Sequence, residues 1–189
     1  MKNFSKFVWV LAVLVASATG ARAAEVQVAV AANFTAPMQK IAAAFEADTG
    51  HTAVLSFGST GKFYAQIKNG APFQLLVAAD DETPARLEKE GQALPGTRFT
   101  YAIGRLVLWS AQPGLVDDKG EVLRAPSQAR IALADPKIAP YGAAAVETLT
   151  SLGLLQSLQS RFVQGENIAQ TYQFAATGNA PWLSSRCRR

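Results

Sequence analysis

The stretch that decides the fold is SFGSTGKFYAQIKNGAPFQLLVAA, residues 56–79. It begins in a strand-like segment, turns at residues 58–61, continues as a short helical pattern and closes in the apolar run FQLLVAA. A nearly continuous apolar run of this length is typical of a parallel strand buried on both faces. A helix that joins two parallel strands is a βαβ unit, so this stretch predicts an open parallel sheet with helices on its faces.

The residues on either side extend the same alternation. Residues 25–32 (EVQVAVAA) predict a strand, and a helix should run from an N-cap at Asn33 to a stop at Gly50. After the central stretch, residues 82–91 predict another helix, and residues 98–110 predict a long strand interrupted at Gly104. Such a strand suits a chain that crosses from one lobe to a second. The second lobe should then contain strands at 129–136 and 161–167 and helices at 141–155 and 168–180.

The first 23 residues predict a secretory signal peptide. Lys2 and Lys6 provide a basic start, residues 7–15 form an apolar run too short to span a membrane, and ARA ends at Ala23. We therefore expect cleavage after Ala23 and export to a bacterial periplasm. The rest divides into a first lobe at residues 24–104, a second lobe at 105–180 and a tail at 181–189.

Charge and cysteine content exclude several functions. The formal net charge is +4, but three basic residues lie in the predicted signal peptide and three in the last four residues, which leaves −2 for the body. No basic stripe remains to follow phosphates, so we expect no nucleic-acid partner. Cys187 is the single cysteine, which rules out an intramolecular disulfide, and the single histidine makes a zinc site a poor prediction.

The turn at residues 58–61 does not meet the requirements of a nucleotide-binding P-loop. Gly61 and Lys62 supply the final Gly-Lys of that motif. Ser56 stands where its first glycine is required, and Phe63 stands where a hydroxyl must bind magnesium. We therefore exclude a nucleotide site and expect Lys62 on a solvated helix face.

The same turn nevertheless has the features of an anion site. Ser59 and Thr60 lie between a strand and a helix, and Asn33 occupies the equivalent place after the first strand. Helix N-termini attract anions through their N–H groups, and the carboxyl ends of parallel strands meet at one edge. The pattern thus predicts a small oxyanion bound by neutral dipoles. The alternative is that Asn33 and Thr60 only cap their helices.

Five segments in order along residues 25–180 closely resemble the periplasmic molybdate-binding proteins of ABC importers. They are VAVAANF (28–34), SFGSTGKFYAQIKNGAPFQLLVAADDETPARLEKEG (56–91), FTYAIGRLVLWS (99–110), DPKIAPYGAAAVETL (135–149) and VQGENIAQTYQFAATGNA (163–180). The resemblance implies a two-lobe α/β periplasmic-binding-protein fold that holds molybdate or tungstate between its lobes. It implies no cofactor and no metal cation, and a monomer that delivers its ligand to an inner-membrane ABC permease.

Carried over by position, the resemblance implies a site made of Asn33, Ser59, Thr60, Tyr141 and Ile168. The first three would donate from the first lobe, and Tyr141 and Ile168 would offer backbone N–H groups from the second. None of the five is Lys or Arg, so the charge of the dianion would be dispersed over several dipoles. Sulfate has shorter bonds and should reach fewer donors, but another tetrahedral oxyanion such as sulfate stays the alternative ligand. We find no coherent nucleophile or acid–base set, and therefore predict a binding protein and not an enzyme.

The tail departs from the resemblance. Members of the family continue past ATGNA with an apolar strand, whereas this chain reads PWLSSRCRR. Residues 182–189 can be encoded by codons that spell LAFVALSQ when they are read one nucleotide earlier. We therefore hypothesise a frameshift near Ala180, which would truncate the chain and leave the fold incomplete at its C-terminus. A non-functional product is the corresponding alternative to a working binding protein.

Overall fold

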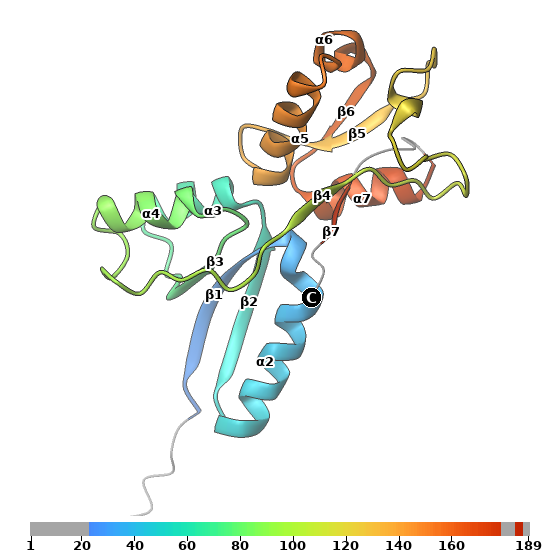
Figure 1. The fold of residues 1–189 in the computed structure, drawn as a ribbon. Coiled ribbons are helices and arrows are strands. Elements are labelled where there is room, and N and C mark those ends of the chain that lie inside the picture. The colour runs from blue at the N-terminus through green and yellow to red at the C-terminus, as the bar shows by residue number, and fades with distance from the viewer. Residues whose placement is uncertain (1–22, 179–183, 187–189) are drawn as a thin grey trace, which may run out of the picture.

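The computed structural model describes residues 23–178 and 184–186, which form two α/β lobes (Figure 1). The first lobe contains a three-stranded parallel sheet of order β2-β1-β3. Its strands are β1 (Glu25–Ala31), β2 (Thr52–Gly58) and β3 (Leu75–Val77). The predicted mixed α/β class with parallel sheets is confirmed. Residues 1–22 of the predicted signal peptide and the proposed frameshift position at Ala180 lie outside the described residues.

Helices cover both faces of the first sheet. Helix α2 (Thr35–Thr49) joins β1 to β2, α3 (Thr60–Lys68) joins β2 to β3, and α4 (Glu82–Lys89) follows. Because β2 and β3 lie on opposite sides of β1, right-handed crossovers place α2 and α3 on opposite faces, as Figure 1 shows. Val28, Val30 and Val77 of the sheet and Met38 of α2 form a buried apolar core in this lobe.

The second lobe has a sheet and a core of its own. Strands β5 (Ile131–Ala134) and β6 (Phe162–Gly165) pair in parallel, flanked by α5 (Pro140–Ser151), α6 (Leu155–Leu158) and α7 (Ile168–Ala176). Short 3-10 turns lie at Glu121–Leu123 (η2) and Gln159–Arg161 (η3). Seven buried apolar residues of this lobe form a cluster separate from that of the first: Leu123, Ile131, Leu133, Ala145, Leu149, Leu154 and Leu158.

The predicted long strand over residues 98–110 is wrong. Only Arg105–Val107 forms a strand, β4, which pairs antiparallel with β7 (Ser184–Arg186). Residues 97–104 are irregular, and Phe99 and Ile103 are 77% and 81% exposed. The apolar pattern misled because a strand requires a neighbouring backbone, and no strand pairs with this segment within the described part of the chain.

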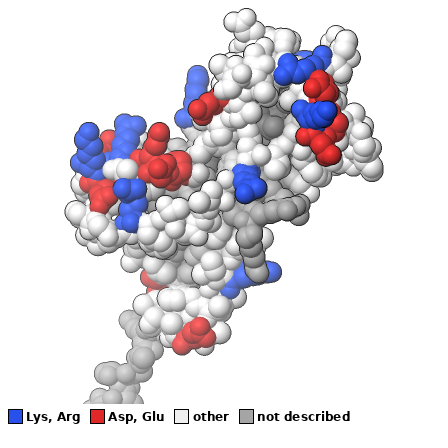
Figure 2. Space-filling model, in the orientation of Figure 1, with Lys and Arg blue, Asp and Glu red and all other residues white. Residues whose placement is uncertain are grey.

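Charged side chains are interspersed on the face that Figure 2 shows. Acidic and basic residues lie together in mixed clusters, one of them over α3 and α4, and large uncharged areas separate them. Within residues 23–178 and 184–186, no helix is long and apolar enough to cross a bilayer.

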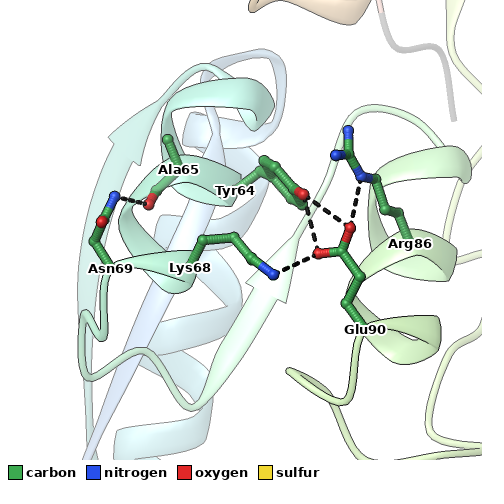
Figure 3. Close-up of polar contacts among 6 residues, drawn as sticks. All are labelled: Tyr64, Ala65, Lys68, Asn69, Arg86 and Glu90. Carbon is green, nitrogen blue, oxygen red and sulfur yellow. Dashed lines mark hydrogen bonds and ion pairs between the residues drawn. The ribbon is translucent and has the colours of Figure 1, made fainter.

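Within the mixed cluster over α3 and α4, three side chains donate to the carboxylate of Glu90 (Figure 3). Its carboxylate accepts from Lys68 Nζ at 2.9 Å, from Arg86 Nε at 2.9 Å and from the Tyr64 hydroxyl at 3.0 and 3.1 Å. The Arg86 guanidinium also lies 4.5 Å from the centre of the Tyr64 ring. The contacts from Lys68 and then Arg86 lower the pKa of Glu90 from 4.5 to about 2.

This depressed pKa predicts a specific loss of stability in acid. A carboxylate with a lowered pKa in the folded state contributes stability above its unfolded pKa and loses it as the pH falls from 4.5 towards 2. Glu90→Gln should therefore lower the melting temperature at pH 7, and its difference from the wild type should vanish near pH 2. Thermal melts followed by circular dichroism from pH 7 to 2 check this. Glu147→Gln, at an exposed position of α5, is the control, and a pH-independent difference for Glu90→Gln would contradict the assignment.

Candidate functional site

A small pocket lies between the lobes, where the strands of the first lobe end and helices of the second begin. All five predicted site residues line it: Asn33, Ser59, Thr60, Tyr141 and Ile168. The remaining lining residues are mostly small: Ala31, Ala32, Gly58, Ala79, Ala139, Pro140 and Asn167. Inside the pocket, the volume that the centre of a water-sized sphere can occupy is about 10 Å³. That is on the order of one such sphere, so the pocket suits a small species.

Asn33 reaches the pocket from a different backbone position than predicted. It lies inside a 3-10 turn, η1 (Ala32–Phe34), and the N-cap of α2 is Phe34, so the predicted capping role of Asn33 is wrong. The tight turn delays the start of the helix, and the Thr35 hydroxyl donates to Ala32 O at 2.9 Å. Asn33 Oδ1 is buried and has no hydrogen-bond partner within the described residues. Rotation of the amide would present Nδ2 as a donor at the same place.

Ser59 and Thr60 both lie at the start of α3, but their hydroxyls are in different states. Ser59 is the N-cap and is 3% exposed, yet its side chain makes no capping bond, and Oγ has no partner among the residues described. Thr60 is 1% exposed, and its Oγ1 accepts from Ala79 N at 3.0 Å. That bond ties α3 to the chain just beyond β3 and leaves the hydroxyl hydrogen of Thr60 to donate elsewhere.

Tyr141 lies in the first turn of α5, which begins at Pro140. Proline suits this place because the first turn of a helix has no carbonyl partner for its N–H groups. The side chain of Tyr141 packs against Gly104, where a Cβ would overlap the phenolic oxygen. Gly104, predicted as a break in a strand, is therefore the position at which the crossing segment makes room for this residue.

Ile168 is the first residue of α7, and Asn167 is its N-cap. Asn167 Oδ1 accepts from Ala169 N at 3.0 Å and from Gln170 N at 3.1 Å. In the described part of the chain, neither the Asn167 side chain nor a backbone carbonyl accepts from the backbone N–H of Ile168. Asn167 also lines the pocket and was missed in the sequence, although an Asn immediately before a predicted helix is the usual signal of an N-cap.

Direct contacts join the two lobes beside the pocket. Gly61 N donates to Ile138 O at 2.9 Å, and Lys62 Nζ lies 2.6 Å from Glu166 Oε2. The expectation that Lys62 lies on a solvated helix face is therefore incomplete, because its ammonium group is paired across the lobes. A Cβ on Gly61 would lie 2.8 Å from Ile138 O and 2.9 Å from Ile138 Cα, so glycine is the residue that permits this approach.

The pocket has polar side chains in a mostly apolar lining and no charged residue. Its lining contains no Asp, Glu, Lys, Arg or His. Within the described residues, no group of three or more His, Cys, Asp or Glu side chains is placed to hold a metal ion. Asn33 Oδ1 and Ser59 Oγ are buried without hydrogen-bond partners among the described residues. Burying a polar group in this way is unfavourable in free energy unless the group forms a hydrogen bond with a bound species. The arrangement is able to surround a small anion with dipoles.

Sequence comparison relates the chain to extracellular binding proteins. The profile of the family described as "Bacterial extracellular solute-binding protein" matches residues 26–186. Molybdate-binding protein ModA of Azotobacter vinelandii is 61% identical over 163 residues, which cover 86% of this chain and 65% of the relative. Molybdate-binding protein ModA of Rhodobacter capsulatus is 52% identical over 171 residues, which cover 90% of this chain and 68% of the relative. The chain thus spans about two thirds of the length of these relatives.

Solved structures agree with the sequence comparison. The periplasmic molybdate-binding protein of Azotobacter vinelandii superimposes with a TM-score of 0.81 at 46% identity, over 86% of this chain and 71% of that one. The substrate-binding domain of a putative molybdenum ABC transporter from Clostridium difficile gives a TM-score of 0.60 over 86% of this chain and 72% of that one. At 23% identity, the second match shows likeness of fold alone.

Proposed function

Because the chain belongs to the family of bacterial extracellular solute-binding proteins, we propose that it binds molybdate or tungstate between its lobes. In this proposal Asn33, Ser59 and Thr60 donate from the first lobe, and the backbone N–H groups of Tyr141 and Ile168 donate from the second. The bound oxyanion is cargo that the protein hands to an inner-membrane ABC permease. The protein acts as a binding component without a cofactor of its own, and not as an enzyme.

One observation carries the proposal. Asn33 Oδ1 and Ser59 Oγ are buried without partners in a pocket that contains no charged side chain. Leaving a buried polar group unpaired costs about 1–3 kcal/mol, so folded proteins seldom keep two together unless a ligand pairs with them. A tetrahedral oxyanion only accepts hydrogen bonds, so Ser59 would donate from its hydroxyl, and Asn33 from Nδ2 after rotation of its amide, because Oδ1 is itself an acceptor. Helix N-termini also favour negative charge.

The names of the relatives favour molybdate over the alternative, sulfate. Molybdate and sulfate carry the same charge, so the site can select between them only by their size. Molybdate and tungstate should bind alike, and the smaller sulfate should reach fewer donors from both lobes at once. When a ligand leaves a buried hydrogen-bonding group of the site unpaired, the affinity typically falls by more than it does when one methylene contact is lost.

Isothermal titration calorimetry of the secreted protein with molybdate, tungstate and sulfate tests the ligand. We expect molybdate and tungstate to bind within about tenfold of one another, and sulfate about a hundredfold or more weaker, as expected when one or two charge-assisted hydrogen bonds are lost. A thermal melt with and without molybdate shows whether the chain folds around a working site, since a ligand that binds the folded state raises the melting temperature. Sulfate binding as tight as molybdate binding would overturn the ligand assignment, and an unchanged melt would favour a non-functional product.

The cellular setting follows from the same family. We propose a periplasmic protein whose signal peptide ends at Ala23, with a first lobe at residues 24–104 and a second at residues 105–180. N-terminal sequencing of the secreted protein should find Ala24 as the first residue. A chain that begins at Met1 after secretion would show that the predicted segment is retained.

A further inference from the structure

Lys62 and Glu166 come from different lobes and meet beside the pocket. Lys62 lies in the first turn of α3, two residues after the pocket residue Thr60. Glu166 follows β6 and comes directly before Asn167, which also lines the pocket. Their side chains form an ion pair of 2.6 Å between Nζ and Oε2, although they stand 104 residues apart in the sequence.

A second contact lies next to the ion pair. The Gly61 N–H donates to Ile138 O at 2.9 Å, just before α5 begins. The first turn of α3 is therefore held to both helix-entry loops of the second lobe, one before α5 and one before α7. Those loops lead into Tyr141 and Ile168, so the position of α3 relative to the second lobe decides how the two walls of the pocket face each other.

We propose that Lys62 and Glu166 are a positioning pair that holds the lobes closed over the pocket and so prolongs the stay of a bound anion. The closing role does not depend on what the pocket binds, whereas its effect on residence rests on the proposed function. The side chains are 45% and 60% exposed, so water and salt weaken their attraction. A weak, exposed pair suits a contact that must break each time the lobes open.

Lys68 supplies a matched control on the same helix. It pairs with Glu90 at 2.9 Å with side chains 38% and 26% exposed, and both partners belong to the first lobe. Removing either lysine takes one exposed cation from α3. Only the loss of Lys62 removes a contact between lobes, so a general effect of charge or helix stability would appear in both variants.

The closing role is tested on the ligand-free protein by pulsed electron paramagnetic resonance. Spin labels are placed at Lys89→Cys in α4 and Gln156→Cys in α6, two exposed positions in different lobes, after Cys187→Ser removes the native thiol. Lys62→Gln and Glu166→Gln should lengthen or broaden the interlobe distance distribution, and so should high salt in the wild type. The swapped pair Lys62→Glu/Glu166→Lys should restore the narrow distribution, and Lys68→Gln should leave it unchanged.

The effect on residence is tested with molybdate by stopped-flow measurement of its dissociation. Lys62→Gln should raise the dissociation rate by about two- to fivefold, the range expected for an exposed ion pair, with recovery in the swapped variant. The proposal is overturned if Lys62→Gln and Glu166→Gln leave the interlobe distances unchanged, or if Lys68→Gln alters them equally. If molybdate does not bind at all, the proposed function fails, while the distance measurement still decides the closing role.

Discussion

Asn33→Asp is expected to abolish molybdate binding, with an affinity loss of about a thousandfold or more. The substitution keeps the size of the side chain and replaces a neutral amide, whose oxygen is buried without a partner, by a carboxylate. Like charges about 4 Å apart repel by about 4 kcal/mol at an effective dielectric constant of 20, and each 1.4 kcal/mol is tenfold in affinity. Calorimetric titration with molybdate measures the loss directly.

Asn33→Ser is the control for that experiment. Serine keeps a hydrogen-bond donor without adding charge, so its affinity should stay within about tenfold of the wild type, the size of one neutral hydrogen bond. Both proteins should keep the wild-type far-ultraviolet circular dichroism, since η1 and α2 do not use the Asn33 side chain as a cap. Tight molybdate binding by Asn33→Asp would show that the anion does not contact this residue.

Gly61→Ala is expected to weaken molybdate binding by about 5- to 150-fold without loosening the first lobe. The added Cβ would lie 2.8 Å from Ile138 O and 2.9 Å from Ile138 Cα, which forces backbone atoms of the two lobes apart. Such overpacking costs about 1–3 kcal/mol. Alanine is the better helix former, so α3 itself should gain stability and the loss should arise from lobe closure alone.

Titration calorimetry together with thermal melts of the ligand-free protein separates these two effects. Gln66→Ala is the matched control, because it adds an alanine at an exposed position of the same helix, away from the second lobe. We expect Gly61→Ala to lose affinity while its melting temperature holds or rises. A Gly61→Ala protein that binds molybdate as tightly as the wild type would show that closure does not require this approach.

Most of the order of strands and helices could be predicted because each signal is local. The valine alternation of β1 and the left-handed Gly50 that ends α2 are properties of short segments. The strand predicted over residues 98–110 failed because its apolar residues do not reveal whether a neighbouring strand exists. Among the residues that the structure describes, only Arg105–Val107 has one, from Ser184–Arg186.

For the candidate site too, local signals in the sequence predicted some features, and others depended on the tertiary structure. The places of Ser59, Thr60 and Ile168 at helix starts were readable from strand-to-helix transitions, and the resemblance assigned them to one pocket. The state of each hydroxyl was not readable, because the bond from Ala79 N to Thr60 depends on how β3 ends beside α3. The 3-10 turn that displaces Asn33 from its predicted cap is likewise a backbone detail without a residue-type signature.

The sequence by itself determined most of the α/β order and the uncharged residues at the starts of the predicted helices, since these depend on residue type and short spacing. Only the tertiary structure decided which loops meet across the lobes. Gly61 against Ile138 and Lys62 against Glu166 join segments far apart in the chain, where no periodicity links the partners. In the sequence Gly61 and Lys62 had no assigned role in the site. In the folded protein their contacts bring its two walls together.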